Sequence, residues 1–168
     1  MEEVSIQEIL KKMLEKEVYV EELSGISVYG YLMAFDDRFL ILSQAEIFGR
    51  RAKVIVDTIF INKEYVGSIC AGVEGITVSR LKKGKVIMLP DLVKAQAKVT
   101  VQTKRGEMVE GTIIGVLNDG VCLYKASVKG IRNYRSRLHL IFFNNIAHIN
   151  TEVISIVPSN KTSSKKSR

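Results

Sequence analysis

Apolar residues follow a helical period at the start of the chain and an alternating period after it. Ile6, Ile9 and Leu10 are interleaved with charged residues, and this spacing predicts a short amphipathic helix. Ser5 and Glu8 stand at the positions of a capping box at its start. Beyond it, short apolar runs between turn residues predict five strands, in the segments 18–23, 28–35, 39–43, 54–61 and 65–70.

The same succession of elements returns later in the chain. Pro90 stands where a helix start tolerates proline and predicts a short helix that runs through Ala97. Asn118-Asp119-Gly120 is a strong hairpin-turn signal. The strands predicted after this second helix occupy the segments 98–104, 109–117, 121–124, 138–143 and 146–149.

The two successions are related by an internal repeat with a constant offset of 81 residues. Gly30 and Gly111 each fall inside the second predicted strand of their copy, where a glycine marks a bend or bulge. We therefore expect equivalent backbone settings at these two glycines, within two small β domains in tandem. The repeat consists of Val18, Val20, Gly25, Gly30, Leu32 and Phe35, which recur as Val99, Val101, Gly106, Gly111, Ile113 and Val116.

The repeat predicts domains at residues 1–75 and 90–157. Each is near the lower size at which a domain holds its own core. The segment 76–89 is a basic linker that could form its own hairpin around a lysine-rich turn. Residues 158–168 are rich in serine and lysine, and we expect a disordered basic tail there.

Charge is divided unevenly along the chain. Residues 1–75 hold eight Lys/Arg and thirteen Asp/Glu, a net charge of −5, whereas residues 76–168 hold seventeen and five, a net charge of +12. This asymmetry predicts different partners for the two domains, with phosphate-backbone contact from the basic one. The alternative is a basic surface that only maintains solubility.

Several protein classes find no support in the sequence. No apolar run reaches the ~20 residues of a membrane helix, and the acidic start does not match a signal peptide. We expect no membrane partner and a cytoplasmic location. Cys70 and Cys122 lack disulfide or zinc spacing, which favours two buried thiols in a reducing compartment.

Enzyme chemistry finds no support either. His139 and His148 lie in predicted strands without a Cys, Ser or carboxylate at catalytic spacing. There is no phosphate-binding loop and no metal-ligand spacing. We therefore expect a protein that is not an enzyme, without catalytic residues, metal, cofactor or small-molecule substrate.

The ordered pattern closely resembles the Sm/LSm (Sm-like) family, which includes the bacterial Sm-like RNA chaperone. The second family motif is matched more loosely, by the segments 59–69 and 140–149. The resemblance implies a mostly β fold: two tandem Sm-like folds, each an N-terminal helix plus a strongly bent five-stranded antiparallel barrel. Abundant Ile, Val and Lys, no Trp and only two Pro also fit a thermophilic archaeal composition. The first family motif is matched by Val18, Val20, Gly25, Gly30, Leu32, Phe35, Asp36 and Leu42, and again by Val99, Val101, Lys104, Gly106, Gly111, Ile113 and Leu123.

The resemblance also implies assembly. In the family, the fourth strand of one subunit pairs with the fifth strand of its neighbour and closes a ring of six or seven. An open bent sheet leaves two unpaired edges that a neighbour can satisfy. Here the two copies could pair internally, and three chains could then form a pseudo-hexamer with other Sm-like subunits or with copies of itself. The alternative is that the linker hairpin covers the edges.

The uridine pocket of the family is degenerate in this chain. Asp36 matches the family loop, and Arg38 and Phe39 could stack on a base, but Leu40 replaces the Asn that reads the base edge. Asn62-Lys63 replaces the Arg-Gly of the other pocket loop, so Lys63 is the remaining cation there. The second copy departs further. We therefore do not expect a ring that reads U-rich RNA through its pore.

A basic loop in the second copy is the strongest candidate for RNA contact. Guanidinium groups bridge phosphates, and a tyrosine among them offers a stacking face. Such a mixture suits single-stranded or structured RNA better than duplex grooves. The alternative is a solvated loop. The candidate RNA-binding residues of this copy are Lys125, Lys129, Arg132, Tyr134, Arg135 and Arg137.

These observations predict an Sm-like RNA-binding protein or ribonucleoprotein component. The second domain supplies the basic contacts, and assembly uses sheet-edge pairing. The alternative is a protein–protein scaffold that keeps the fold and has lost RNA binding. The degenerate pocket favours the scaffold, whereas the charge of the second half favours RNA.

Overall fold

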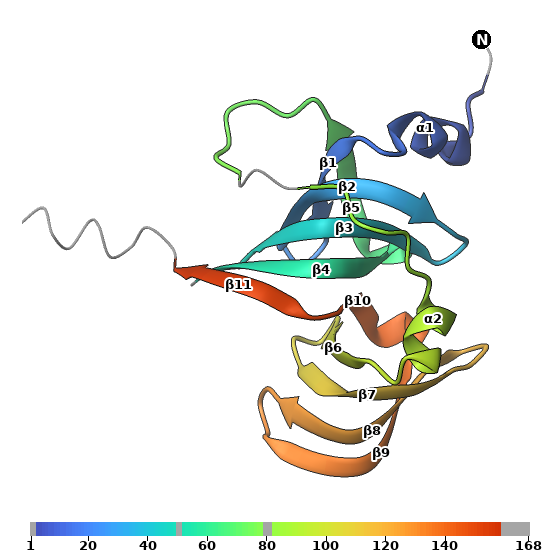
Figure 1. The fold of residues 1–168 in the computed structure, drawn as a ribbon, viewed down its shortest axis with the longest axis vertical. Helices are drawn as coiled ribbons and strands as arrows, with labels where there is room; N and C mark the ends of the chain where they lie inside the picture. Colours follow the sequence, from blue (N-terminus) through green and yellow to red (C-terminus); the bar gives the residue numbers. More distant parts are fainter. Residues whose placement is uncertain (1–2, 50–51, 79–81, 159–168) are drawn as a thin grey trace, which may run out of the picture.

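The computed structural model describes residues 3–49, 52–78 and 82–158. Their strands form one 11-stranded antiparallel sheet, accompanied by two α-helices (Figure 1). The fold is therefore mostly β, as predicted. No helix among the described residues is both long enough and apolar enough to cross a lipid bilayer.

The first part of the chain forms what we call the N-terminal half-sheet. The helix α1 (Ile6–Met13) begins at Ser5, whose side chain accepts a hydrogen bond from the Glu8 amide. Helix α1 buries Leu10, in agreement with the apolar spacing of its sequence. The strands are β1 (Glu17–Glu22), β2 (Ser27–Phe35), β3 (Phe39–Phe48), β4 (Ala52–Asn62) and β5 (Val66–Ala71), with the 3-10 helix η1 (Lys63–Tyr65) between the last two.

The second part forms the C-terminal half-sheet. Helix α2 (Leu89–Lys94) carries Pro90 near its start, as predicted. The strands are β6 (Lys98–Thr103), β7 (Met108–Val116), β8 (Gly120–Lys129), β9 (Tyr134–Phe142) and β10 (Ile146–Asn150), with the 3-10 helix η2 (Phe143–Asn145) before β10 and the extra strand β11 (Val153–Pro158) at the end.

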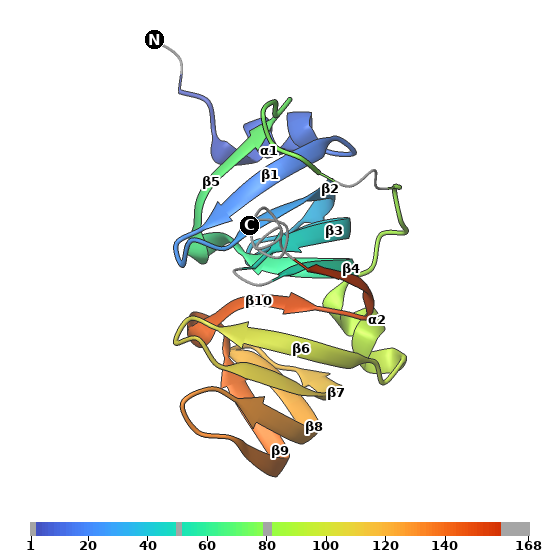
Figure 2. The same cartoon turned by 90° about the vertical axis from the view of Figure 1, so that its left-hand side faces the viewer.

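Both half-sheets have the same internal strand order. The N-terminal one runs β5-β1-β2-β3-β4 and the C-terminal one runs β10-β6-β7-β8-β9, so each has its fifth strand at one edge and its fourth at the other. The two are joined where β4 pairs with β10 (Figure 2). The sheet is thus open, and β4 pairs with β10 and β11 rather than closing onto β5.

The linker, the end of the chain and the two cysteines differ from the sequence-based expectation. Residues 76–78 and 82–88 of the predicted linker contain no strand, so its described part forms no hairpin. Strand β11 was not predicted, and its last residue, Pro158, belongs to the sheet rather than to the tail. The rest of the predicted tail, 159–168, lies outside the described residues. Cys70 is exposed and Cys122 is partly buried, so the prediction of two buried thiols is wrong.

The equivalence of Gly30 and Gly111 is confirmed. The pairing of β2 with β3 shifts between Tyr29 and Tyr31, and that of β7 with β8 shifts at the equivalent place, 81 residues later. A Cβ at Gly30 would lie 3.1 Å from the Ala45 Cα, and one at Gly111 would lie 3.2 Å from the Ala126 Cα. Positive φ values recur at the same offset, at Glu15 and Gln96 and at Gln44 and Lys125.

One of two hydrophobic clusters spans the junction of the half-sheets. One buried cluster fills the N-terminal half-sheet and contains Leu10, Val18 and Leu32. The other contains the apolar residues of the C-terminal half-sheet and, from the N-terminal one, Phe39, Ile41 and Phe60. Because these three residues pack with the second cluster, the two half-sheets are one packed body.

Candidate nucleic-acid interface and sheet edges

The junction between the half-sheets shows how one sheet edge is covered by another part of the same chain. His148 pairs with Ile61, and the ladder continues to Asn150 opposite Ile59. Strand β11 then takes over, from Val153 opposite Val56 onward. Strands β10 and β11 together cover the outer edge of β4.

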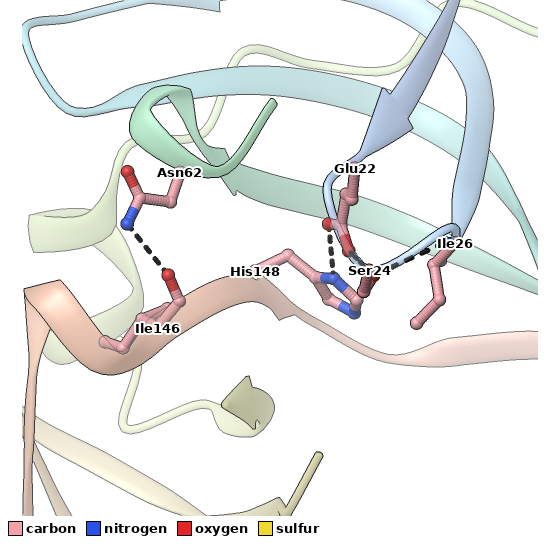
Figure 3. Close-up of polar contacts among 6 residues, drawn as sticks. All are labelled: Glu22, Ser24, Ile26, Asn62, Ile146 and His148. Atoms are coloured by element: carbon pink, nitrogen blue, oxygen red, sulfur yellow. Dashed lines mark hydrogen bonds and ion pairs between the residues drawn. The ribbon is translucent and has the colours of Figure 1, made fainter. Parts of the chain in front are cut away.

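A buried ion-pair geometry connects the two half-sheets at this junction (Figure 3). The His148 Nδ1 lies 2.7 Å from the Glu22 Oε2, and the two side chains are 5% and 0% exposed. Glu22 is placed by the turn after β1, where Gly25 has φ +93° and Ser24 Oγ donates to the Glu22 carboxylate at 3.4 Å. Because both groups are desolvated, removal of either side chain would leave the other buried without this hydrogen bond.

Asn62 provides a second polar connection at the junction (Figure 3). Its Nδ2 donates to the carbonyl oxygens of Ile146 at 2.8 Å and Phe143 at 3.1 Å, and its Oδ1 accepts from the Glu64 amide. Asn62 stands where the family pocket has Arg-Gly. In this chain it satisfies backbone carbonyls of the other half-sheet.

The ring of Phe39 belongs to the core of this junction. Phe39 is 1% exposed, and its ring makes edge contacts with Phe60 and Phe143 at centroid distances of 6.3 and 5.7 Å. A buried ring offers no face to a base at the surface. The prediction that Phe39 stacks on a base is therefore wrong for this structure, because tertiary packing places the β4–β10 junction over it.

The other two candidates of the first copy lie beside Phe39. The guanidinium of Arg38 stacks over the Phe143 ring at 4.4 Å, and its Nη2 donates to the Asn118 carbonyl at 2.8 Å. The Lys63 Nζ donates to the Asp36 carbonyl at 3.1 Å. Arg38, Phe39 and Lys63 thus lie close together, and Arg38 bridges the two half-sheets.

The candidates of the second copy form a separate group on β8, β9 and the turn between them. Strand β8 reaches Lys129 and strand β9 starts at Tyr134, so the predicted long loop is shorter, and Arg135 and Arg137 are strand residues. All six candidates are exposed: Lys125, Lys129, Arg132, Tyr134, Arg135 and Arg137. The Tyr134 ring is stacked on the His139 imidazole at 6.2 Å, and Ser136 Oγ lies 2.8 Å from His139 Nδ1.

Two strands stand at the ends of the sheet. Strand β5 is the edge of the N-terminal half-sheet, and a groove of about 540 Å³ beside it is lined by residues of α1 and β5, including Ile6, Ile9 and Ile69. Strand β9 is the edge of the C-terminal half-sheet and exposes Leu140 and Phe142 at 46% and 53%. Exposed apolar edges of this kind are ready to pair with another chain.

The positions equivalent to Lys98 on β6 and Glu110 on β7 are occupied in the N-terminal half-sheet by Glu17 and Tyr29. There, Glu17 accepts hydrogen bonds from the hydroxyls of Tyr29 and Tyr31. Burial and the Glu17 carboxylate raise the pKa of Tyr29 to about 12. The hydrogen bond with Glu17 also raises the pKa of Tyr31. Both phenols therefore stay neutral at physiological pH.

Sequence reasoning missed the roles of Glu22 and Asn62 at the buried junction and did not include Lys98 among the candidate RNA-binding residues. Nothing in the local pattern around Glu22 indicates burial, because its partner His148 is 126 residues away. Lys98 could have been found, because it begins the first predicted strand of the second copy, and the next strand along the chain carries Gly111, the equivalent of Gly30. The apolar run 153–157 before Pro158 could have indicated β11.

Comparison with known proteins adds no further assignment. No protein-family profile matches the chain, and no curated protein sequence matches it.

Proposed function

We propose that the chain is an Sm-like RNA-binding protein or ribonucleoprotein component. It binds single-stranded or structured RNA through the C-terminal half-sheet and assembles through its sheet edges. The observation that carries the proposal is the exposed cluster of cations on β8 and β9. At the positions equivalent to Lys125, Arg135 and Arg137, the N-terminal half-sheet has the uncharged residues Gln44, Val54 and Val56. Exposed cations that gather on one face attract a phosphate backbone.

The backbone supports the Sm-like part of this proposal. Two half-sheets with the same five-strand order, each preceded by a helix and bent at a glycine in the second strand, fit the predicted tandem of bent units. Each unit has open edges and is therefore not a closed barrel by itself. Open edges are expected of a unit that completes its sheet through a neighbour.

The internal junction supports the assembly part. Strand β4 is the fourth strand of its half-sheet and β10 the fifth of the other, and this pairing leaves one fourth strand, β9, and one fifth strand, β5, at the ends. A second copy can join β9 to β5 in the same way, head to tail. Such a contact is heterologous and forms a ring if its rotation closes, and three chains would give six units.

The repeat offset predicts the register of this contact. Phe142 of one copy falls opposite Gly67 of the next, as Ile61 falls opposite His148 within the chain. Within the chain, the Thr151 amide donates to the Thr58 carbonyl at 2.9 Å. By the same offset, His139 is equivalent to Thr58, and Cys70 of the next copy is equivalent to Thr151. Residues 139 and 70 of neighbouring copies should therefore be close enough for a disulfide.

A cross-linking experiment tests the assembly. With His139→Cys, we expect oxidation to form disulfide-linked ladders of chains through Cys70, seen on a non-reducing gel. The matched control, His139→Cys with Cys70→Ser, should stay monomeric on the same gel. A monomeric mass in solution for the unmodified chain, together with no ladder, would exclude edge assembly.

An RNA-binding experiment tests the other part. Filter binding to a mixed RNA pool should show tight, salt-dependent binding by the unmodified chain. The variant Arg132→Ala/Arg135→Ala/Arg137→Ala should bind more weakly and with a smaller salt slope. Unchanged and salt-insensitive binding, or none, would favour the alternative.

The alternative is a protein–protein scaffold of the same fold without RNA binding. The observation that favours it is the state of the degenerate pocket, where Phe39 is buried and Arg38 is engaged with Phe143 and Asn118. A scaffold would assemble in the cross-linking experiment and fail in the RNA experiment.

A further inference from the structure

The bend at Gly111 leaves a surface hollow on the C-terminal half-sheet. The hollow measures about 590 Å³ and lies between the starts of β6 and β9 and the middle of β8. A Cβ at Gly111 would approach the Tyr124 carbonyl oxygen to 3.1 Å, so the strands come close together at this point. Four cations and one carboxylate line the hollow: Lys98, Lys125, Arg135, Arg137 and Glu110.

The charges in this hollow are not balanced by the chain. Among the residues that the structure describes, no carboxylate lies within ion-pair distance of any of the four cations. Glu110 is the single acid at the lining. Four like charges around one hollow repel one another, and a bound anion would relieve that repulsion.

The cations come from three strands and are spread along the hollow. Arg135 and Arg137 are two residues apart on β9, and the rise of a strand separates such residues by about 6.7 Å. This is comparable with the distance between successive phosphates of an extended single strand. A double helix presents a convex surface, which does not enter a hollow of this size.

The equivalent place in the N-terminal half-sheet is chemically different and is covered by the chain itself. The positions equivalent to Lys98, Lys125, Arg135 and Arg137 hold Glu17, Gln44, Val54 and Val56. Strand β11 pairs with Val54 and Val56, and the linker lies on β3, where the Gly84 amide donates to Ser43 Oγ at 3.0 Å. The chain therefore covers one of these two places and leaves the cationic one open.

We propose that the hollow at Gly111 is the phosphate-binding site for single-stranded RNA, with Lys98, Lys125, Arg135 and Arg137 as its cations. This inference rests on the proposed RNA-binding function and identifies its main site. It adds Lys98 to the interface and moves the interface from the β8–β9 turn to the bent face of the sheet. The other occupant to consider is an acidic segment of a protein partner, and the test separates the two.

The test uses two charge-matched double variants of the full chain. Lys98→Gln/Lys125→Gln removes two cations of the hollow and leaves the β9 edge intact. Lys94→Gln/Arg105→Gln removes two exposed cations of the same half-sheet, on α2 and on the β6–β7 turn, outside the hollow. The probe is a mixed-sequence single-stranded RNA, titrated at several salt concentrations, and thermal unfolding verifies that all variants are folded.

We expect Lys98→Gln/Lys125→Gln to lower the affinity about tenfold or more. Its salt slope should fall by about 1.4, because two phosphate contacts are lost at ~0.7 each for a single strand. The control should change both quantities much less. Equal losses in the two double variants, with the unmodified chain binding RNA, would overturn the hollow as the site and leave the RNA-binding function standing.

Two other outcomes would also overturn the inference. If the unmodified chain binds no RNA, the proposed RNA-binding function fails and the inference fails with it. If Lys98→Gln/Lys125→Gln binds RNA normally but has a lower mass in solution than the unmodified chain, the hollow is a protein contact and the inference is overturned.

Discussion

The N-terminal and C-terminal half-sheets bend at the same places, yet their surfaces carry different chemistry. Bulges, left-handed residues and the close approach at Gly30 and Gly111 recur at one constant offset. On β1 and β2, the cluster of Glu17, the buried Tyr29 and Tyr31 is replaced by Lys98, Glu110 and Thr112 on β6 and β7. The backbone geometry depends on a few small residues in tight places, so the exposed positions were free to diverge.

The edges of the two half-sheets differ in a second way. The β4 edge is covered by β10 and β11, and the β4–β10 junction carries two polar connections, from Asn62 and from the Glu22–His148 pair. The β9 edge is uncovered and exposes Leu140 and Phe142, and the position equivalent to Asn62 is the buried Phe143 of η2. The internal junction is therefore held by buried polar contacts as well as by strand pairing, whereas an outer junction at β9 would depend more on apolar contact.

The largest expected effect is that of Phe39→Ala, which tests the hydrophobic cluster that spans the junction. Since this ring packs across the junction, we expect a loss of about 3–5 kcal/mol in the free energy of unfolding. Urea unfolding should still show one transition, and hydrogen exchange should accelerate in β6 and β10 as well as in β3 and β4. Acceleration confined to the N-terminal half-sheet would contradict the shared core.

The polar connection is tested by Glu22→Ala. Removing one partner leaves His148 buried without its hydrogen bond, so we expect a loss of about 3 kcal/mol. Glu22→Gln keeps a hydrogen-bonding oxygen and should lose less. Urea unfolding measures both, and a loss below about 1 kcal/mol for Glu22→Ala would mean that the junction does not depend on this pair.

The equivalence of the two bends is tested by Gly30→Ala and Gly111→Ala. Each new methyl group would lie 3.1–3.2 Å from a backbone atom of the neighbouring strand. We expect each variant to lose about 1–3 kcal/mol, by similar amounts, because overpacking forces the strands apart. Thermal unfolding provides the comparison, and a large loss at one glycine with none at the other would break the equivalence.

The smallest expected effect concerns alkaline pH. The pKa of Tyr29 is raised to about 12 in the folded state, from 10.0. Its contribution to stability is therefore fully present below pH 10.0 and is lost as the pH rises towards 12. The difference in unfolding free energy between the unmodified chain and Tyr29→Phe should shrink over this range. A constant difference would show that the Tyr29 hydroxyl is not tied to Glu17.

The strand succession and the bends could be predicted because they depend on local patterns. Gly30 and Gly111 stand inside apolar alternation, and the turn at Gly25 and its equivalent is visible in the residue types. The exposed cations Lys125 and Arg135 could also be identified, because charged residues rarely become buried without a partner. The sequence predicts a strand over 138–143, whereas β9 already begins at Tyr134. Its first residues show no apolar alternation, because an edge strand can expose both faces.

The chain by itself determined the repeat, the position of each bend and the separation of charge, because these follow from residue type and spacing along short segments. Tertiary structure alone decided that Phe39 is buried, that Glu22 meets His148 and that β11 returns to β4. These contacts join residues far apart in the chain, so no local pattern encodes them. Apolar burial favours the position of Phe39, whereas the desolvation of Glu22 and His148 has a cost that their mutual hydrogen bond offsets.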